Sequence, residues 1–231
     1  MNRETYRLLE NWMHSQMTDS AHDREHVYRV LYTALDLAEA EETVDMDVLT
    51  AACLLHDVGR KEQFADPTLC HAQVGGEKAY RFLVENGFSE TFARHVKECI
   101  ACHRFRKNNP PVSIEAKILF DADKLDVTGA IGIARTLLYS GQNSRPLYSV
   151  EPDGQIRDGA GDTEDSFFRE YKFKLEKIYD RFYTVQGREE ALKRREAAVT
   201  YYENLLREVR RSYAGRICLE EWLKGGSDGQ V

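Results

Sequence analysis

The sequence lacks any apolar run of the length that a membrane-spanning helix needs. Such a helix takes roughly 18 or more consecutive apolar residues, and no segment of the 231 residues provides them. The N-terminal stretch MNRETYRLLENWMHSQM carries acidic residues early and lacks the unbroken apolar core of a signal peptide. We therefore expect a cytoplasmic protein with no membrane partner.

Excess positive charge is also absent, because 32 basic residues face 39 acidic ones and the net charge is −7. This balance disfavours a nucleic-acid partner. Cysteine is scarce, and the five cysteines are an odd, scattered set that does not form a disulfide framework.

One cysteine motif, CIACH from Cys99 to His103, has the spacing of covalent c-type haem attachment. A Cys/Cys/His zinc site is the other alternative for this motif. No export signal accompanies the motif, and no second cysteine pair completes a tetrahedral zinc set. We expect two helix cysteines that precede a functional histidine.

Strand patterns are nearly absent, and apolar residues recur with the 3.6-residue period of helices. Asp23, Asp45 and Ser89 are typical helix N-caps, and Gly59 is expected to stop a helix in a left-handed conformation. The sequence therefore predicts an all-α helical bundle, with helices over 3–17, 23–41, 46–58, 70–86, 89–104, 113–140, 164–182 and 187–213.

We expect one domain over residues 1–215, with a core at about 20–140 and the helices of 163–213 packed on it. Residues 141–162 form a polar loop rich in Gly, Pro and Asp, and such a long loop is typically functional or disordered. This loop is a candidate to cover the site. Residues 216–231 are expected to be a short C-terminal segment with a flexible tail. The apolar stripe of the last helix serves either the core or a dimer seam, so monomer and homodimer both stay open.

The segment AACLLHDVGR places His56 and Asp57 at the end of an almost wholly apolar helix. Burying an unpaired carboxylate is costly unless the charge is paired or binds a metal. No basic residue precedes the pair in this helix, and the nearest cations, Arg60 and Lys61, come only after the expected helix end at Gly59. The pattern therefore favours a bound cation.

Two further helices bring metal-type ligands to an apolar stripe. His26 lies four residues before Val30 on such a stripe, and His22 lies one turn earlier. The window ILFDADKLDVTGAIGIA carries Asp121, Asp123 and Asp126. The alternative is three solvent-facing aspartates beside a core stripe. Ligands from three helices together indicate a metal site between helices.

The ordered set His26, His56, Asp57 and Asp123 resembles the signature of the HD superfamily of metal-dependent phosphohydrolases. The segments HDREHVYRV, LLHDVGR, DADKLDVTGAIGIARTL and SRPLY, and the stretch from SFFREYKF to KRRE, are similar to one subgroup of small bacterial proteins. Some of these act as nucleotide pyrophosphohydrolases or phosphatases. The resemblance covers roughly residues 10 to 213.

The resemblance implies that these four residues bind a divalent metal ion. His71 and His103 stand where some relatives hold a second metal, and in mononuclear relatives such groups hold or protonate a phosphate. One or two ions are therefore expected. Imidazoles with carboxylates suit Mn²⁺, Fe²⁺, Ni²⁺, Co²⁺ or Zn²⁺, and suit Mg²⁺ less well.

Further roles follow for residues around the expected ligands. Asp57, His103 and Asp126 are the candidate catalytic residues, with Asp126 orienting a ligand or accepting a proton. The candidates for substrate binding are Arg60, Lys61, Lys124 and Arg145, with Arg104 as a further cation and Tyr148 as a residue that stacks on a base. Each of these cations has the alternative of an ordinary surface charge.

The sequence thus predicts a metal-dependent phosphohydrolase that cleaves ester or anhydride bonds, most plausibly of nucleotides, with metal-activated water. One alternative is a ligand-sensing or scaffold module that keeps the metal without turnover. Others are a phosphodiesterase acting on RNA or a cyclic dinucleotide, and an iron oxygenase if two irons bind.

Overall fold

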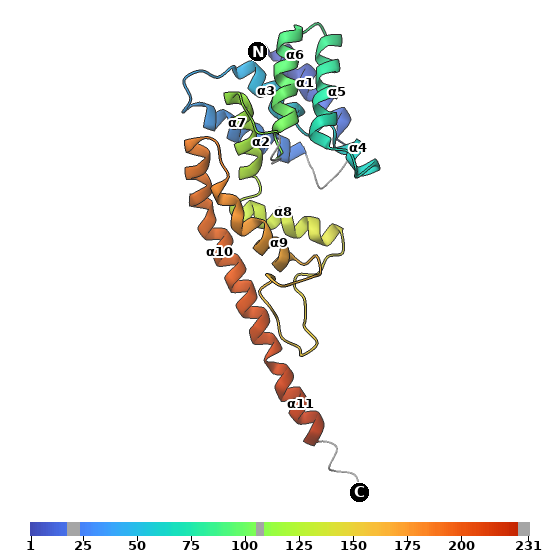
Figure 1. Ribbon diagram of the computed structural model, residues 1–231, viewed down its shortest axis with the longest axis vertical. Helices are drawn as coiled ribbons and strands as arrows, with labels where there is room; N and C mark the ends of the chain where they lie inside the picture. The colour runs from blue at the N-terminus through green and yellow to red at the C-terminus, as the bar shows by residue number, and fades with distance from the viewer. Residues whose placement is uncertain (18–23, 105–108, 226–231) are drawn as a thin grey trace. The chain divides into compact units, whose positions relative to one another are not determined.

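The computed structural model describes residues 1–17, 24–104 and 109–225, and its regular elements are helices (Figure 1). Within these ranges it contains no strand, only an isolated bridge between Val150 and Ile156. The all-α prediction is confirmed. The elements are α1 (Arg3–Gln16), α2 (Arg24–Ala38), α3 (Met46–Leu55), α4 (Arg60–Ala65), α5 (His71–Glu85), α6 (Glu90–Cys102), α7 (Ile114–Leu125), α8 (Gly129–Gln142), α9 (Phe167–Phe173), the 3₁₀ helix η1 (Leu175–Asp180), α10 (Val185–Tyr213) and α11 (Gly215–Gly225).

The chain divides into two compact units. Unit 1 comprises Met1–Val127 and Asp180–Leu192, and unit 2 comprises Thr128–Tyr179 and Lys193–Val231. That one domain spans residues 1–215 stays a prediction. Among the described residues, no helix combines the length and the apolar content that crossing a membrane requires.

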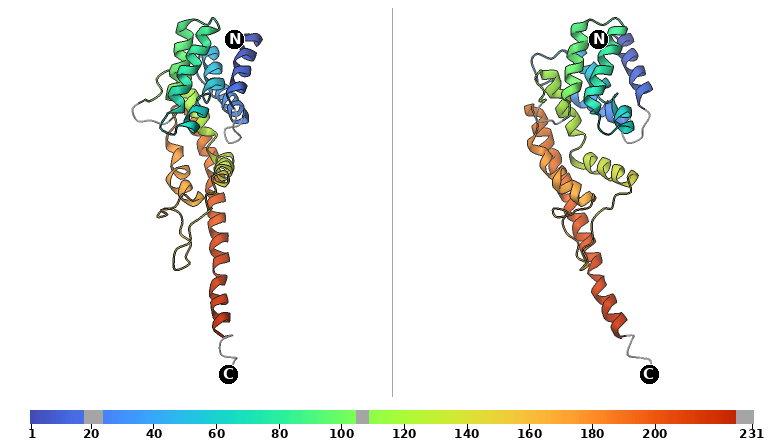
Figure 2. Two further views of the ribbon diagram at one scale, coloured as in Figure 1. Left: turned by 90° about the vertical axis from the view of Figure 1, so that its right-hand side faces the viewer. Right: turned by 45° about the vertical axis from the view of Figure 1, so that its right-hand side comes forward.

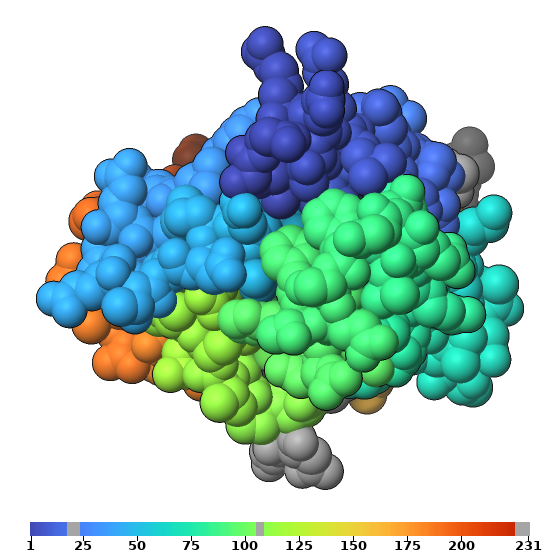
Figure 3. Space-filling view, turned by 90° about the horizontal axis from the view of Figure 1, so that it is seen from above, coloured from blue at the N-terminus to red at the C-terminus, as the bar shows by residue number. Residues whose placement is uncertain are grey.

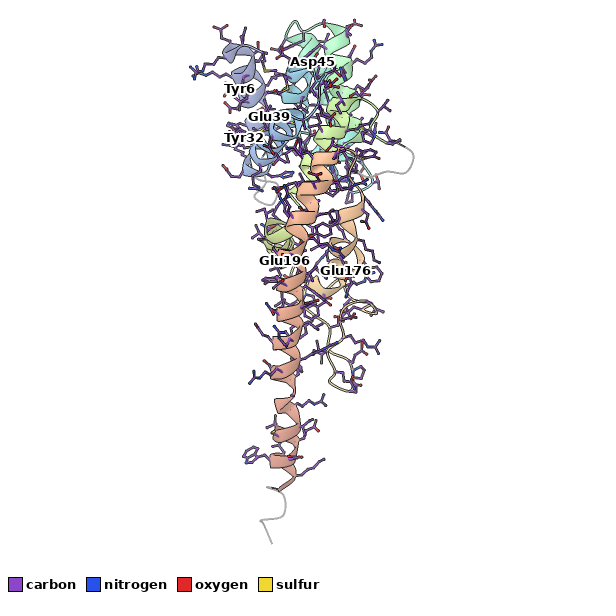
Figure 4. All side chains as sticks on the ribbon, turned by 90° about the vertical axis from the view of Figure 1, so that its left-hand side faces the viewer. Tyr6, Tyr32, Glu39, Asp45, Glu176 and Glu196 are labelled. Atoms are coloured by element: carbon purple, nitrogen blue, oxygen red, sulfur yellow. The ribbon has the colours of Figure 1, made fainter. Side chains whose placement is uncertain are left out.

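Unit 1 is built around α3, where seven of ten residues are buried. Asp45 begins this helix as predicted, because its carboxylate accepts hydrogen bonds from the backbone N–H groups of Asp47 and Val48 (Figure 4). Helices α5 and α6 lie side by side in both views of Figure 2, and α1 covers part of the same unit beside them in Figure 3. The predicted cap Asp23 and the neighbouring His22 lie outside the described residues.

The end of α3 differs from the prediction. The helix ends at Leu55, and Gly59 has φ −93°, so the expected left-handed stop is wrong. Glycine is required here by a close approach of two backbones. A Cβ atom on Gly59 would lie 2.6 Å from the Gly75 amide nitrogen and closer still to the His71 carbonyl oxygen. This contact brings the start of α5 against the turn that joins α3 to α4.

The predicted helix over 113–140 is interrupted at residues 126–128, giving α7 and α8. Asp126 is the C-cap of α7, and Gly129 has φ +61°, a conformation that L side chains rarely adopt. The periodic pattern continues across this break, which is why the sequence predicted one helix. The break ends α7 with the Asp126 carboxylate turned inward, where it is 5% exposed.

Asp121 has a structural part within unit 1. Its buried carboxylate accepts hydrogen bonds from the backbone N–H groups of Tyr183 and Thr184 and from the Thr184 hydroxyl. Burial raises the pKa of Asp121, while these donors act in the opposite direction. The carboxylate thereby fastens the start of α10 to α7.

Unit 2 has its own core, in which aromatic rings predominate, with Tyr171 stacked on Tyr202 at 3.9 Å between centroids. The polar loop 141–162 takes part in this core through Ile156, and Tyr148 packs against Phe168 and Tyr213. Those contacts occupy the ring that was a candidate to stack on a base. The loop's place over the site stays a prediction.

The helical pattern of the C-terminal region also differs in detail from the prediction. The helix expected over 164–182 is two elements in the structure. The α-helix α9 ends with Lys174 as its C-cap, and the 3₁₀ helix η1 follows. The segment beyond residue 215 forms α11, which the sequence did not predict.

Candidate metal centre

Helix α2 places His26 in the interior of unit 1, where it is 1% exposed. Its Nδ1 lies 2.7 Å from Asp126 Oδ2 and donates to that carboxylate. Asp126 also accepts a bidentate pair of hydrogen bonds from Arg29, at 2.7 and 3.0 Å. The Nε2 atom of His26 is then left to face Asp123 Oδ1 at 3.3 Å.

His56 follows the last residue of α3 and is fully buried. Its Nδ1 donates to the Cys53 carbonyl oxygen at 2.7 Å, a bond within the last turn of the helix. The ring is thereby held with Nε2 pointing at His26 Nε2, 3.3 Å away. Asp57, the next residue, is 2% exposed.

A second pair of histidines has the same construction. His71 begins α5 and donates from Nδ1 to Gln63 Oε1 at 2.7 Å. The amide orientation of Gln63 is fixed because its Nε2 donates to the Leu69 carbonyl. His103 follows α6 and donates from Nδ1 to the Ile100 carbonyl at 2.7 Å. The two Nε2 atoms face each other at 3.2 Å.

These bonds fix the tautomers of all four imidazoles. Each Nδ1 faces an oxygen that can only accept, so each Nε2 of a neutral ring carries a lone pair. Burial lowers the pKa of His71 to about 2 and that of His103 to about 4, so both rings are neutral near pH 7. Two lone pairs at 3.2 or 3.3 Å repel each other unless a cation lies beside them. The arrangement is therefore suited to divalent cations.

Asp57 stands between the two histidine pairs. Its Oδ2 lies 3.7 Å from Nε2 of His26 and of His56, and its Oδ1 lies 3.4 and 3.7 Å from Nε2 of His71 and His103. Oδ2 is buried without a hydrogen-bond partner. Burial would raise the pKa of Asp57, but the charge of the Arg60 guanidinium opposes it most strongly, and the pKa lies well below its usual range. An ionised oxygen with no donor is what a metal ligand requires.

The ligand-type atoms form two groups, each within 4.8 Å of one another. The first cluster is His26, His56 and Asp123, and the second cluster is Asp57, His71 and His103. Neutral imidazoles with ionised carboxylates fit Mn²⁺, Fe²⁺, Co²⁺, Ni²⁺ or Zn²⁺. The structure thus brings together all six residues expected to be ligands, and their role as ligands stays a prediction.

The residues expected to bind substrate have different surroundings. Arg60 donates from Nε to Asp57 Oδ1 at 3.0 Å, with 24% of its side chain exposed. Lys61 is exposed on α4. Lys124 is buried instead: its ammonium donates to the Arg181 carbonyl at 3.1 Å and lies 4.1 Å from the centroid of the Phe120 ring.

Burial lowers the pKa of Lys124 to about 8. The hydrogen bond of Lys124 to the Arg181 carbonyl and its packing on the Phe120 ring favour a structural role. That Lys124 binds substrate stays a prediction, and these contacts do not support it. Arg145 belongs to unit 2, where it pairs with Asp165 at 3.5 Å and lies over the Tyr139 ring. Its assignment to the site also stays a prediction.

Two residues of the centre were not predicted from the sequence. Arg29 holds Asp126, and Gln63 holds His71. Arg29 lies three residues after His26, one turn along α2, which is the signal that could have pointed to it. Gln63 lies on the short helix α4, which the periodicity did not reveal.

The cysteine alternatives for the CIACH motif gain no support. Burial raises the pKa of Cys99 to about 12 and that of Cys102 to about 11, so both thiols stay protonated. No cysteine belongs to either of the ligand groups found among the described residues.

The model of the HD domain family matches residues 24–128, which contain all the ligand-type residues above. The uncharacterized protein YpgQ of Bacillus subtilis is 30% identical over 208 residues, covering 87% of this chain and 92% of its own length.

Two solved structures are similar. Bacillus subtilis YpgQ in complex with ADP is 28% identical with a TM-score of 0.68, over 88% of this chain and 97% of that one. An HD-superfamily hydrolase from Bacillus thuringiensis is 29% identical with a TM-score of 0.66, over 89% and 97%. The sequence resemblance is confirmed, and the chain belongs to the HD domain family.

Proposed function

We propose that this chain is a metal-dependent phosphohydrolase that cleaves ester or anhydride bonds of nucleotides with metal-activated water. The observation that carries the proposal is the pair of Nε2 to Nε2 contacts, at 3.3 and 3.2 Å, with the Asp57 carboxylate between them. Every Nδ1 hydrogen is committed to an oxygen, so the inner face of the centre offers only lone pairs. The structure of YpgQ with ADP supports a nucleotide as the substrate class.

The residues would divide between two ions. His26, His56, Asp123 and Asp57 Oδ2 would hold one, and Asp57 Oδ1, His71 and His103 would hold the other. A bound divalent cation lowers the pKa of coordinated water toward neutrality and neutralises charge on phosphoryl oxygens. Hydrolysis then needs no protein nucleophile.

The remaining residues would orient the ligands and bind the phosphate of the substrate. Asp126 keeps His26 with its Nε2 inward, which is the orienting role expected for this carboxylate. His103 was expected to be catalytic, but its lowered pKa and its bond to Ile100 leave Nε2 without a proton at pH 7. It therefore serves better as a ligand than as a proton donor. Arg60, partly exposed beside Asp57, is the best-placed group for a phosphate.

The test is hydrolysis of nucleoside mono-, di- and triphosphates by metal-stripped protein refilled with Mn²⁺, with products resolved by chromatography. His56→Gln and Asp57→Asn should abolish turnover. His95→Gln is the matched control, because His95 bonds Ser113 and Glu115 and belongs to neither cluster. Turnover that needs metal, survives in the control and is lost in the two variants supports the hydrolase.

The identity of the products names the bond that is cleaved. If the refilled protein binds Mn²⁺ and hydrolyses no phosphate compound in the panel, the proposal is wrong and the sensing alternative takes its place.

A further inference from the structure

The two clusters differ in charge. The first cluster combines two imidazoles with Asp123 and, across 3.7 Å, with Asp57 Oδ2, which has no hydrogen-bond partner. The second cluster has one carboxylate oxygen, Asp57 Oδ1, and Arg60 donates to it at 3.0 Å. A cation in the first cluster therefore meets Asp123 and the Asp57 oxygen that has no donor, whereas a cation in the second cluster meets only the Asp57 oxygen that accepts from Arg60.

The oxygen atoms that accept from the imidazole Nδ1 atoms also favour a cation in the first cluster. In the first cluster His26 donates to the Asp126 carboxylate, which also accepts from Arg29, and a carboxylate acceptor makes the ring a stronger ligand than an amide acceptor does. In the second cluster His71 donates to the neutral amide of Gln63. The partners of His56 and His103 are backbone carbonyls in both cases, so they cancel in the comparison.

Two arginines add positive charge to the second cluster. Arg60 donates to Asp57 Oδ1, and that oxygen lies 3.4 Å from His71 Nε2. Arg104 lies near the start of α5, with its guanidinium 3.9 Å from Cys70 Sγ. A divalent cation entering beside His71 meets this positive charge as well.

We propose that the two clusters fill in order: the first binds its ion in the free protein, and Arg60 excludes the second ion until a phosphate group draws the guanidinium from Asp57. This rests on the proposed metal-dependent function and names a gating residue for it. The guanidinium fork suits phosphate oxygens, and the freed Asp57 Oδ1 becomes available to the ion. The second ion and the phosphate then bind together.

The expected difference in affinity is large. Loss of the hydrogen-bond acceptor of one ligand histidine changes metal affinity by about 10- to 100-fold. The second cluster has one carboxylate fewer than the first and has two arginines nearby, and both differences lower its affinity for a cation. We expect the two dissociation constants for Mn²⁺ to differ by at least about 100-fold in the absence of phosphate.

The test is a titration of metal-free protein with Mn²⁺, followed by electron paramagnetic resonance with and without inorganic phosphate. The signal of free Mn²⁺ gives the number of bound ions. Two Mn²⁺ ions that share a carboxylate couple magnetically, which distinguishes the paired centre from an ion bound elsewhere. Wild type should bind one ion tightly without phosphate and acquire the coupled spectrum when phosphate is added.

Arg60→Gln should bind the second Mn²⁺ ion without phosphate. Adding phosphate should then raise the affinity of this variant for the second ion only slightly. Arg60→Lys retains the charge and should restore the dependence on phosphate. Arg94→Gln is the matched control, because Arg94 is an exposed arginine of α6 that pairs with Glu90 and belongs to neither cluster. It should behave as wild type does.

Two equally tight ions in wild type without phosphate would overturn the proposal and leave the hydrolase standing. The same follows if Arg60→Gln keeps the wild-type order of filling while circular dichroism shows that it is folded. If no variant and no wild-type sample binds Mn²⁺, the proposed function fails together with this inference.

Discussion

Replacing Gly59 by alanine tests how the backbone contact between α5 and the turn after α3 builds the centre. The new Cβ would lie 2.6 Å from the Gly75 amide nitrogen and closer to the His71 carbonyl oxygen. Both neighbours are backbone atoms, so no flexible side chain can move aside. Relief requires the end of α3 and the first turn of α5 to separate by about 1 Å, an overpacking strain of about 2 to 3 kcal/mol.

This strain has two measurable consequences. For a protein of this size, about 1 kcal/mol corresponds to about 2 to 4 °C in Tm, so the metal-free variant should melt about 5 to 10 °C below wild type. The separation also moves His71 away from Asp57, whose Oδ1 lies 3.4 Å from His71 Nε2. A displacement of about 1 Å at a catalytic constellation costs on the order of 100-fold in rate.

The assay is differential scanning calorimetry of metal-stripped protein, so that bound ions do not contribute to Tm. Gly141→Ala is the matched control, because Gly141 lies in α8 and its Cβ would meet no heavy atom within 4 Å. Its Tm should stay the same or rise, since alanine favours a helix over glycine. If Gly59→Ala melts within about 2 °C of wild type with unchanged metal affinity, the steric reasoning is refuted.

Three further predictions concern the groups around the clusters. Asp126→Asn should weaken Mn²⁺ binding at the first cluster by about 10- to 100-fold, because His26 loses its carboxylate partner; an unchanged dissociation constant in calorimetric titration would contradict this. Gln63→Ala should weaken only the second cluster, by about 10-fold, since His71 loses the acceptor that orients its ring; equal weakening of both ions would show that the clusters are not separable. Burial would raise the pKa of Glu115, but hydrogen bonds and a nearby imidazole outweigh it, so the folded pKa lies below the usual 4.5. Ionised Glu115 thus contributes stability above pH 4.5, and this stability is lost as pH falls through the folded pKa. Urea unfolding should therefore show that wild type is more stable than Glu115→Gln at pH 7. The difference in unfolding free energy should shrink below pH 4.5.

The sequence by itself determined the helical class and pointed to the residues that the structure gathers in the two clusters. The 3.6-residue period marks α2, α3, α5 and α6 because a helix buries one face and the pattern is local. His56 and Asp57 stand out because an apolar helix such as α3 does not end in two polar groups without a partner. Both signals are contained in windows of about 10 to 18 residues.

Only the tertiary structure decided how those residues are used. The bond from His26 to Asp126 joins residues 100 positions apart, and it selects which nitrogen of the ring faces the centre. The roles of Gln63 and Arg29 and the burial of Lys124 depend on neighbours from other helices in the same way. Gly59 was expected to serve a local conformation and instead serves a contact with α5. Periodicity reports which face of a helix is buried, but the partner of a polar atom is set by helices distant in the chain, and that pairing exists only once they pack.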